Sequence, residues 1–554
     1  MDRNLFENLN TPYQTYPFDQ IQEADYKPAF EKGFKQHDEE IEAIANNESA
    51  PTFANTIEAF ERSGEFLSSV QSVFYNLLSA ESTPTMQDFA NDISPIETDH
   101  YANIFMNEKL FQRVKAIYEK KDELGLTMEQ LVLLDKVYDG FIVRGANLTG
   151  QDRETFRDLS KKSAALQLKY GQNLLNATNA FEMVLTEEDE LKGLPEDVRD
   201  AAKLKAQEKE KQGFLFDLSA PSYIAFMKYS QNRELRKKLY LAYNTKANGG
   251  EFDNTEIVRD LVNTRLAIAN LLGYKDYASS VLKHRMAKDK EGVYNLLDSL
   301  RIATKDFALG EVKEIENIAK NANGDDFILM PWDWAFYSEK LKEEKFSIND
   351  EIIRPYFELE NVKKGVFGLA NKLYGLEFKK NEQIPVYHKE VEAFEVYDAD
   401  NSFLAVLYVD FHPRASKQGG AWMTEYKCQH IDANGKNVRP HISIVMNLTR
   451  PTQTKPALLS IDELQTFLHE FGHAIHGMVA NTTYESVAGT NVYRDFVELP
   501  SQLMENWATE KEYLDSFATH YETKEPIPSD LIAKIKAADN YHSGYAMMRQ
   551  LSFG

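Results

Sequence analysis

Apolar residues recur at helical spacing along most of the chain, and this pattern predicts a mainly α-helical protein. In the first part of the chain we expect helices over residues 28–46, 55–78, 128–141, 152–185 and 196–212. A short strand-like run follows at residues 213–216. Helix is then expected from residue 219 to residue 300, with a loop at residues 248–250.

The pattern changes between residues 384 and 448, which form the one clearly β-rich region. Residues 394–397 and 403–409 flank a turn signal at residues 398–401, and residues 441–446 read as a further strand. We therefore expect a small β-sheet directly before the next helix of the chain.

That next helix carries the clearest start signal in the sequence. Ser460 and Glu463 have the spacing of a capping box, in which the serine side chain bonds the third backbone N–H of the helix. Apolar residues then recur on one helical face, at Leu464, Phe467, Leu468, Phe471, Ile475 and Met478.

Inside this helix the chain reads His469-Glu470-Phe471-Gly472-His473. Two histidines four residues apart lie on one helical face, so both imidazoles can reach one metal ion. Glu470 can then take a proton from a water on that ion. An ordinary amphipathic helix with two surface histidines is the plain alternative, but the cap, the apolar face and the spacing coincide here. Gly472 costs about 1 kcal/mol of helix propensity relative to alanine, which suggests that a neighbour packs closely there.

A catalytic zinc usually has three protein ligands, so a carboxylate is expected from another element. Pro500 fits only near the start of a helix, which places Glu498 at its entrance and favours Glu498 as the third ligand. Asp495 and Glu505 are rivals. Glu505 lies seven residues beyond Glu498, about 10 Å along a helix, so both cannot touch one ion. Asp495 is expected instead to hydrogen-bond a ligand histidine.

Substrate contacts are predicted outside this ligand set. His476 shares a face with His469 but lies too far along the helix to complete the site, so we expect a structural or substrate-binding role for it. An edge strand beside a zinc site can hold an extended peptide by main-chain hydrogen bonds. Gly419 and Gly420, followed by Ala421, would let a substrate backbone approach closely; a plain hairpin loop is the alternative.

These residues resemble the thimet oligopeptidase family of zinc metallopeptidases, and its bacterial peptidyl-dipeptidase (dipeptidyl carboxypeptidase) branch most of all. The resemblance covers nearly the whole chain, with similar strings at residues 17–21, 28–30, 331–337, 345–346, 355–359, 384–388 and 416–423. It implies one zinc ion per chain, held by His469, His473 and Glu498, with Glu470 as general base. It also implies two helical lobes flanking a deep channel that admits short unstructured peptides, from which C-terminal dipeptides are released.

We expect an N-terminal helical region over residues 1–215 and a catalytic domain over residues 216–554. The apolar pattern still runs at Gly554, so we expect the catalytic domain to be incomplete there. The resemblance implies that the oxyanion-stabilising side chains lie beyond Gly554. Tyr541, His542 and Tyr545 are expected to belong to the helix before that stretch rather than to replace them.

The composition limits the partners, the disulfide bonds and the cellular location that the protein can have. The 554 residues include 63 Lys and Arg against 87 Asp and Glu, a net charge of −24, which disfavours nucleic acid and anionic membranes as partners. Cys428 is the only cysteine, so no intrachain disulfide can form. No apolar run is long enough for a membrane span, and the start of the chain lacks the pattern of a signal peptide. We expect a cytoplasmic monomer; a periplasmic protein whose signal has been removed is the alternative.

The sequence thus predicts a zinc peptidase that removes C-terminal dipeptides. An oligoendopeptidase of the same family is one alternative, and an inactive, zinc-loaded peptide-binding fragment is another. An aminopeptidase is disfavoured because no Gly-Ala-Met-Glu-Asn-like string is present to hold a substrate amine.

Overall fold

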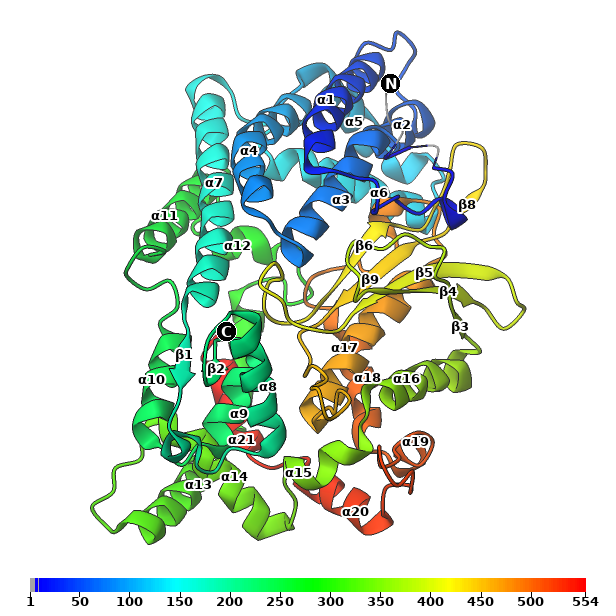
Figure 1. Cartoon of the computed structure of the whole chain (residues 1–554). Helices are drawn as coiled ribbons and strands as arrows, with labels where there is room; N and C mark the ends of the chain where they lie inside the picture. The colour runs from blue at the N-terminus through cyan, green and yellow to red at the C-terminus, as the bar shows by residue number, and fades with distance from the viewer. Residues whose placement is uncertain (1–4, 8) are drawn as a thin grey trace.

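A computed structural model of the chain describes residues 5–7 and 9–554. Residues 1–4, on which part of the signal-peptide prediction depends, lie outside the described residues. The fold is mainly helical with a small mixed sheet, as predicted, and Figure 1 shows the helices gathered in two lobes. In the part of the chain that is described, no helix is both long and apolar enough to cross a membrane.

The first lobe begins with the N-terminal helices at the top of Figure 1. They are α1 (Glu23–Ala45), α2 (Ala59–Glu61), α3 (Glu65–Ala80), α4 (Pro84–Phe105), α5 (Glu108–Tyr118), α6 (Met128–Val143) and α7 (Gly150–Ala180).

The single helix predicted over residues 55–78 is wrong, because the helix is interrupted between α2 and α3. Gly64 has a φ of 76°, and a Cβ on it would lie 2.9 Å from the ring of His37. Only glycine fits this left-handed position beside a packed side chain.

The second lobe lies at the lower left of Figure 1. It contains β1 (Met183–Leu185), β2 (Phe214–Phe216), α8 (Glu196–Glu208), α9 (Ala220–Tyr229), α10 (Arg233–Asn244), α13 (Lys290–Asn323), α14 (Pro331–Phe346) and α21 (Ser543–Leu551). The helices α11 (Thr255–Leu271) and α12 (Tyr277–Leu282) lead into α13, and α11 packs on α7. The helix predicted over residues 152–185 ends at Ala180, because β1 pairs with β2 and buries Met183 and Leu185. The domain boundary that we predicted at 215/216 falls within β2.

A five-stranded sheet forms the centre of the first lobe. Its order is β3 (Glu377–Lys380), β4 (Glu392–Tyr397), β5 (Phe403–Asp410), β9 (His441–Val445) and β6 (Trp422–Lys427). The strands predicted at 394–397, 403–409 and 441–446 are therefore confirmed. The β5 and β9 strands run parallel, and β6 lies antiparallel to β9 at the edge. A separate pair, β7 (His430–Ile431) and β8 (Asn437–Val438), follows β6.

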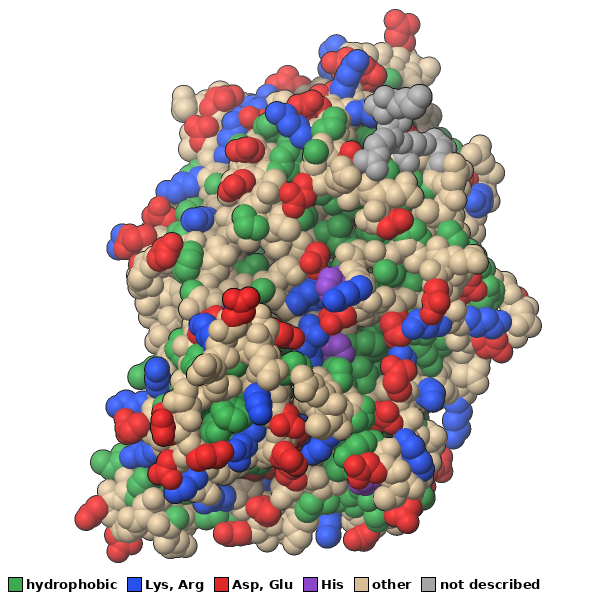
Figure 2. Space-filling view, in the orientation of Figure 1, with side chains coloured by type: hydrophobic (Ala, Val, Ile, Leu, Met, Phe, Trp, Pro, Cys, Tyr) green, Lys and Arg blue, Asp and Glu red, His purple; other side chains and the backbone are tan. Residues whose placement is uncertain are grey.

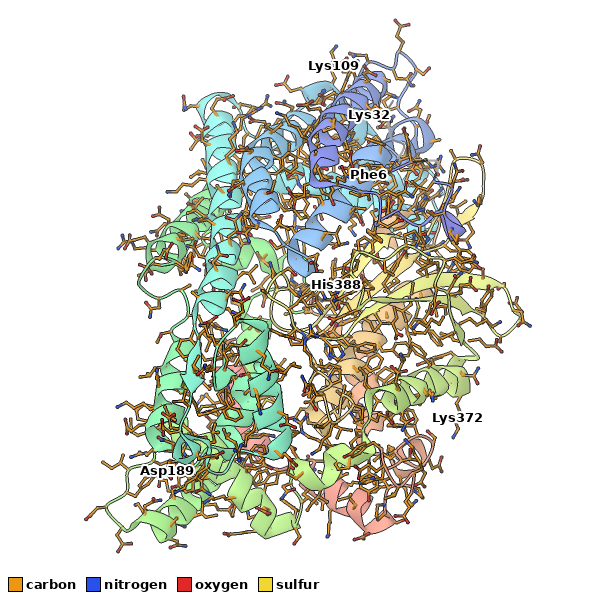
Figure 3. The ribbon with its side chains drawn as sticks, viewed as in Figure 1. Phe6, Lys32, Lys109, Asp189, Lys372 and His388 are labelled. Carbon is orange, nitrogen blue, oxygen red and sulfur yellow. The ribbon has the colours of Figure 1, made fainter. Side chains whose placement is uncertain are left out.

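Alternate side chains of β5 pack in two different hydrophobic cores, because successive side chains of a strand point to opposite faces. Val406 and Tyr408 pack with the N-terminal helices, whereas Leu407 and Val409 pack with the helices below the sheet. Those lower helices are α15 (Asp350–Ile353), α16 (Leu359–Tyr374), α17 (Ile461–Met478), α18 (Glu498–Glu505), α19 (Lys511–Leu514) and α20 (Ser529–Ala538). In Figure 3 the labelled Lys372 lies on the outer side of this layer, whereas His388 lies near the middle of the view, between the lobes.

Candidate active site

The helix that carries both motif histidines, α17, begins as the sequence predicts. Ser460 is its N-cap: its hydroxyl accepts the backbone N–H of Glu463 at 3.2 Å, and its own N–H donates to Glu463 Oε2 at 2.8 Å. Leu464, Phe467 and Leu468 are fully buried under the sheet. The cap and the buried face together fix the direction in which the opposite face of α17 points.

A second helix, α18, crosses α17 at Gly472. A Cβ on Gly472 would lie 2.6 Å from Cα of Ser501 and 2.7 Å from the carbonyl oxygen of Pro500. This contact confirms the close packing that a glycine inside the motif suggested. Since α18 begins at Glu498, the glycine lets the start of α18 reach the histidine face of α17.

Three potential metal ligands meet where the two helices cross. Nε2 of His469 lies 3.2 Å from Oε2 of Glu498, and Nε2 of His473 lies 3.1 Å from the same oxygen. In the described part of the chain this is the one set of three His, Cys, Asp or Glu residues whose ligand atoms all lie within 4.8 Å of one another. The structure thus brings together the three side chains that the sequence selects, and Figure 2 shows histidine side chains at the surface between the lobes.

Glu505 holds the far side of one of these imidazoles. Its Oε1 lies 2.6 Å from Nδ1 of His469, which leaves Nε2 of that ring facing Glu498. The carboxylate of Glu498 is held in turn by Ser501, whose hydroxyl donates to Oε2 at 2.8 Å. Both histidine and carboxylate are therefore oriented by neighbours on α18.

The structure corrects the role predicted for Asp495. Its carboxylate oxygens accept the backbone N–H groups of Met286 and Ala287, each at 3.0 Å, and it bonds no ligand histidine. The contact expected of Asp495 belongs to Glu505 instead. The sequence held the signal for this, because seven residues make two helical turns and place Glu498 and Glu505 on one face of α18.

Glu470 lies beside the three converging groups. Its side chain is almost fully buried, and Oε2 makes no hydrogen bond within the described part of the chain. Burial raises the pKa of Glu470 to about 7, although the neighbouring His469 opposes the shift. A buried carboxylate with an unused oxygen close to His469 and Glu498 is suited to exchange a proton with a bound molecule.

This arrangement can be compared with known proteins. The sequence profile described as Peptidase family M3 matches residues 226–554. Over 99% of its length the chain is 34% identical to a dipeptidyl carboxypeptidase of Salmonella typhimurium, covering 80% of that protein. It is 36% identical to the dipeptidyl carboxypeptidase of Escherichia coli, over 98% of this chain and 79% of that one. It is also 33% identical to oligopeptidase A of Escherichia coli, over 99% and 81%.

The chain belongs to peptidase family M3. It is a metallopeptidase that acts on peptides, so the resemblance read from the motifs is confirmed at the level of family and enzyme class. The profile begins at residue 226, within α9.

The three converging side chains, His469, His473 and Glu498, have different electrostatic surroundings. The hydrogen bond to Glu505 raises the pKa of His469, whereas burial lowers the pKa of His473. Partial burial would raise the pKa of Glu498, but Ser501 and the two imidazoles outweigh it and the pKa lies below its ordinary value. The site thus favours an ionised Glu498 facing the histidines.

The residues predicted to contact substrate lie outside the set of three converging side chains. His476 is in the last turn of α17, outside the ligand set, and its Nδ1 has no partner among the described residues. Gly419, Gly420 and Ala421 lie in the connection from β5 to β6. Because β9 separates these two strands, the connection is not a plain hairpin loop.

Three ring side chains near the end of the chain, those of Tyr541, His542 and Tyr545, contact residues of the second lobe. The hydroxyl of Tyr541 donates to the carbonyl of Ser338 at 2.9 Å, and Nδ1 of His542 lies 3.0 Å from the Ser338 hydroxyl. The ring of Tyr545 stacks on Trp334 at 4.0 Å. These contacts join α21 and the residues before it to α14.

Proposed function

We propose that this M3 peptidase binds one zinc ion through Nε2 of His469, Nε2 of His473 and a carboxylate oxygen of Glu498. The convergence of these three atoms within 4.8 Å carries the proposal. Two imidazoles and one carboxylate form a ligand set that suits catalytic zinc and leaves a position for water. When bound, zinc polarises the scissile carbonyl and makes water a nucleophile near neutral pH.

Glu470 is the proton carrier of this proposal. Its buried carboxylate takes the proton of the attacking water and then donates it to the leaving amine, so one side chain acts first as base and then as acid. Glu505 keeps His469 in the tautomer that presents Nε2, and Ser501 holds Glu498 in place. Each of these roles uses a contact already present in the chain.

The substrates are proposed to be short, unstructured peptides that enter a deep channel between the lobes and lose C-terminal dipeptides. Two relatives that are dipeptidyl carboxypeptidases, at 34% and 36% identity, support this specificity. The similarity to oligopeptidase A, at 33%, favours internal cleavage as the second candidate. We further propose that residues 216–554 form the catalytic domain and that the enzyme works as a cytoplasmic monomer.

Mass spectrometry of an N-acetylated pentapeptide tests this function. The zinc-loaded protein should release the C-terminal dipeptide when the carboxylate is free and leave a C-terminally amidated copy intact. Glu470→Gln should slow the release by about a hundredfold or more while zinc stays bound. Cleavage of both peptides would favour the oligopeptidase alternative, and cleavage undiminished by Glu470→Gln would contradict the role of Glu470.

A further inference from the structure

The strand β6 pairs with β9 on one side only, so its other edge is open to further main-chain bonding. In an antiparallel ladder, the main-chain groups of alternate residues point toward the partner strand and away from it. The carbonyl of Glu425 points away, since it accepts Oγ of Ser72 at 3.1 Å and Nδ2 of Asn76 at 3.2 Å. Both donors belong to α3, so this helix closes the open edge at Glu425.

A register shift strengthens this closure. The pairing of β6 with β9 slips between Glu425 and Lys427, and such bulges end regular pairing. The carbonyl of Tyr426, inside the slip, also accepts the Ser72 hydroxyl, at 2.9 Å. The Ser72 hydroxyl shares its one proton between these two carbonyls, and Asn76 is a second donor to Glu425, so donors of α3 compete with an added strand there.

The part of the β6 edge that precedes Glu425 is not bonded by α3 in this way. Alternation places the main-chain groups of Met423, two residues earlier, on the same outward side as those of Glu425, and those of Ala421 follow in turn. Among the described residues, no side chain or loop backbone bonds the main chain of Met423 or Ala421. An extended peptide could pair with both.

The same helix also bounds the other end of this open stretch. The N–H of Gln418 donates to the carbonyl of Ser79 at 2.9 Å, and the N–H of Ser82 donates to the carbonyl of Ser416 at 2.7 Å. Ser79 lies seven positions after Ser72 in α3, which corresponds to about 10 Å along the helix. That length matches about three residues of extended chain at 3.3 Å each. Figure 1 shows the end of α3 above the sheet, on the side of β6.

This stretch lies beside the helix of the metal centre. A Cβ on Gly477 would lie 2.8 Å from Cε of Met423 and 2.7 Å from Oε1 of Glu425. Gly477 is one helical turn beyond His473 on α17, so β6 runs within side-chain reach of the ligand helix.

We propose that Ser72 and Asn76 set the length of peptide that the β6 edge accepts. The proposal rests on the proposed function, in which a peptide lies extended beside the metal centre. The substrate backbone pairs with Ala421 and Met423, and pairing stops at Glu425 because α3 already satisfies that carbonyl. Ser72 and Asn76 are thus specificity-determining residues that need not touch the substrate.

A series of N-acetylated peptides of increasing length tests this proposal. The peptides share one C-terminal tetrapeptide and grow at the N-terminus from four to ten residues, and mass spectrometry gives kcat/KM for each. For the wild type, kcat/KM should stop rising once the β6 edge is filled. In Ser72→Ala/Asn76→Ala the Glu425 carbonyl is freed, so kcat/KM should rise further for longer peptides, by about threefold to tenfold for one added hydrogen bond.

Matched variants separate the possible outcomes. Ser79→Ala should keep the wild-type length profile, because that hydroxyl bonds only the carbonyl of Tyr75 in its own helix. If the double variant does not fold, Ser72→Ala and Asn76→Ala should each shift the profile less in the same direction. If kcat/KM depends on peptide length as in the wild type, or falls equally at every length, the role of Ser72 and Asn76 is overturned but the proposed function is not. Failure of the wild type to cleave any peptide would instead overturn the proposed function.

Discussion

At the proposed zinc site, the ring of His469 is held between two carboxylates of α18. Glu498 faces its Nε2 at 3.2 Å and Glu505 faces its Nδ1 at 2.6 Å. Such a partner on the far nitrogen fixes the tautomer of a ligand histidine and raises its basicity. We therefore expect the charge of Glu505 to affect zinc binding although Glu505 lies outside the proposed ligand set.

Glu505→Gln should weaken zinc binding by about tenfold to a hundredfold, because the amide keeps the shape of the side chain but loses the charge. Competition with a chromogenic chelator measures this affinity. Glu512→Gln is the control, since the side chain of Glu512 is 91% exposed and lies away from the centre. Equal zinc affinity in the two variants would contradict the role of Glu505.

At the scale of elements, the crossing of α17 and α18 depends on Gly472. Gly472→Ala should destabilise the protein by about 1–3 kcal/mol, because the added methyl group meets the backbone of Pro500 and Ser501. Gly368→Ala, in α16, is the matched control. Nothing lies within 4 Å of a Cβ there, so it should stabilise the protein by about 0.5–1 kcal/mol. Thermal unfolding compares the two variants, and an equally stable Gly472→Ala would rule out this close packing.

A second element-scale contact joins α1 and α4 through two buried histidines. Nδ1 of His37 lies 2.9 Å from Nε2 of His100, whose Nδ1 faces Asp38 at 3.1 Å. Burial lowers the pKa of His37 from 6.5 to about 4, so the folded protein keeps this ring neutral in a range where the unfolded chain protonates it. Protons therefore favour unfolding there.

Wild-type stability should fall as the pH drops from about 6.5 toward 4, with His37 contributing on the order of 2–3 kcal/mol to the loss. His37→Gln removes this group, so its unfolding temperature should decline less between pH 7 and pH 4.5. Urea unfolding at several pH values gives the same comparison. Parallel declines in both proteins would show that His37 does not carry this pH dependence.

How far the sequence predicted these elements depends on the range of the interactions. The cap at Ser460 and the helix position of Glu498 were predictable because they depend on neighbours a few residues away. The break at Gly64 was not, since it depends on the ring of His37 from another helix. Asp495 was misassigned for the same reason: its partners, Met286 and Ala287, lie more than two hundred positions earlier in the chain.

At the scale of the whole molecule, Asp495 joins the loop before Glu498 to the connection between α12 and α13, which leads into the second lobe. The two hydrogen bonds that Asp495 accepts tie the loop before Glu498 to the connection between the lobes. Hydrogen bonds to a charged group contribute about 1.5–3 kcal/mol each when buried, and solvent screening lowers this at an exposed carboxylate such as Asp495. This contact should therefore protect the backbone of that connection without acting on the metal itself.

Asp495→Ala should make the amides of Met286 and Ala287 exchange with solvent about tenfold faster or more, because both lose their acceptor. Zinc affinity should stay within about twofold of the wild type. Hydrogen exchange with mass spectrometry follows the amides, and Asp298→Ala, at an exposed position of α13, is the control. A large loss of zinc affinity would restore Asp495 to the role beside a ligand histidine that the sequence suggested.

X-ray absorption at the zinc edge of the zinc-loaded protein tests the central claim most directly. The account predicts one zinc per chain with two imidazole nitrogens and oxygen ligands at about 2.0–2.2 Å, and no sulfur. It also predicts that His473→Ala removes one imidazole from the spectrum. A third imidazole, a sulfur ligand, or a spectrum unchanged by His473→Ala would contradict the assignment of His469, His473 and Glu498.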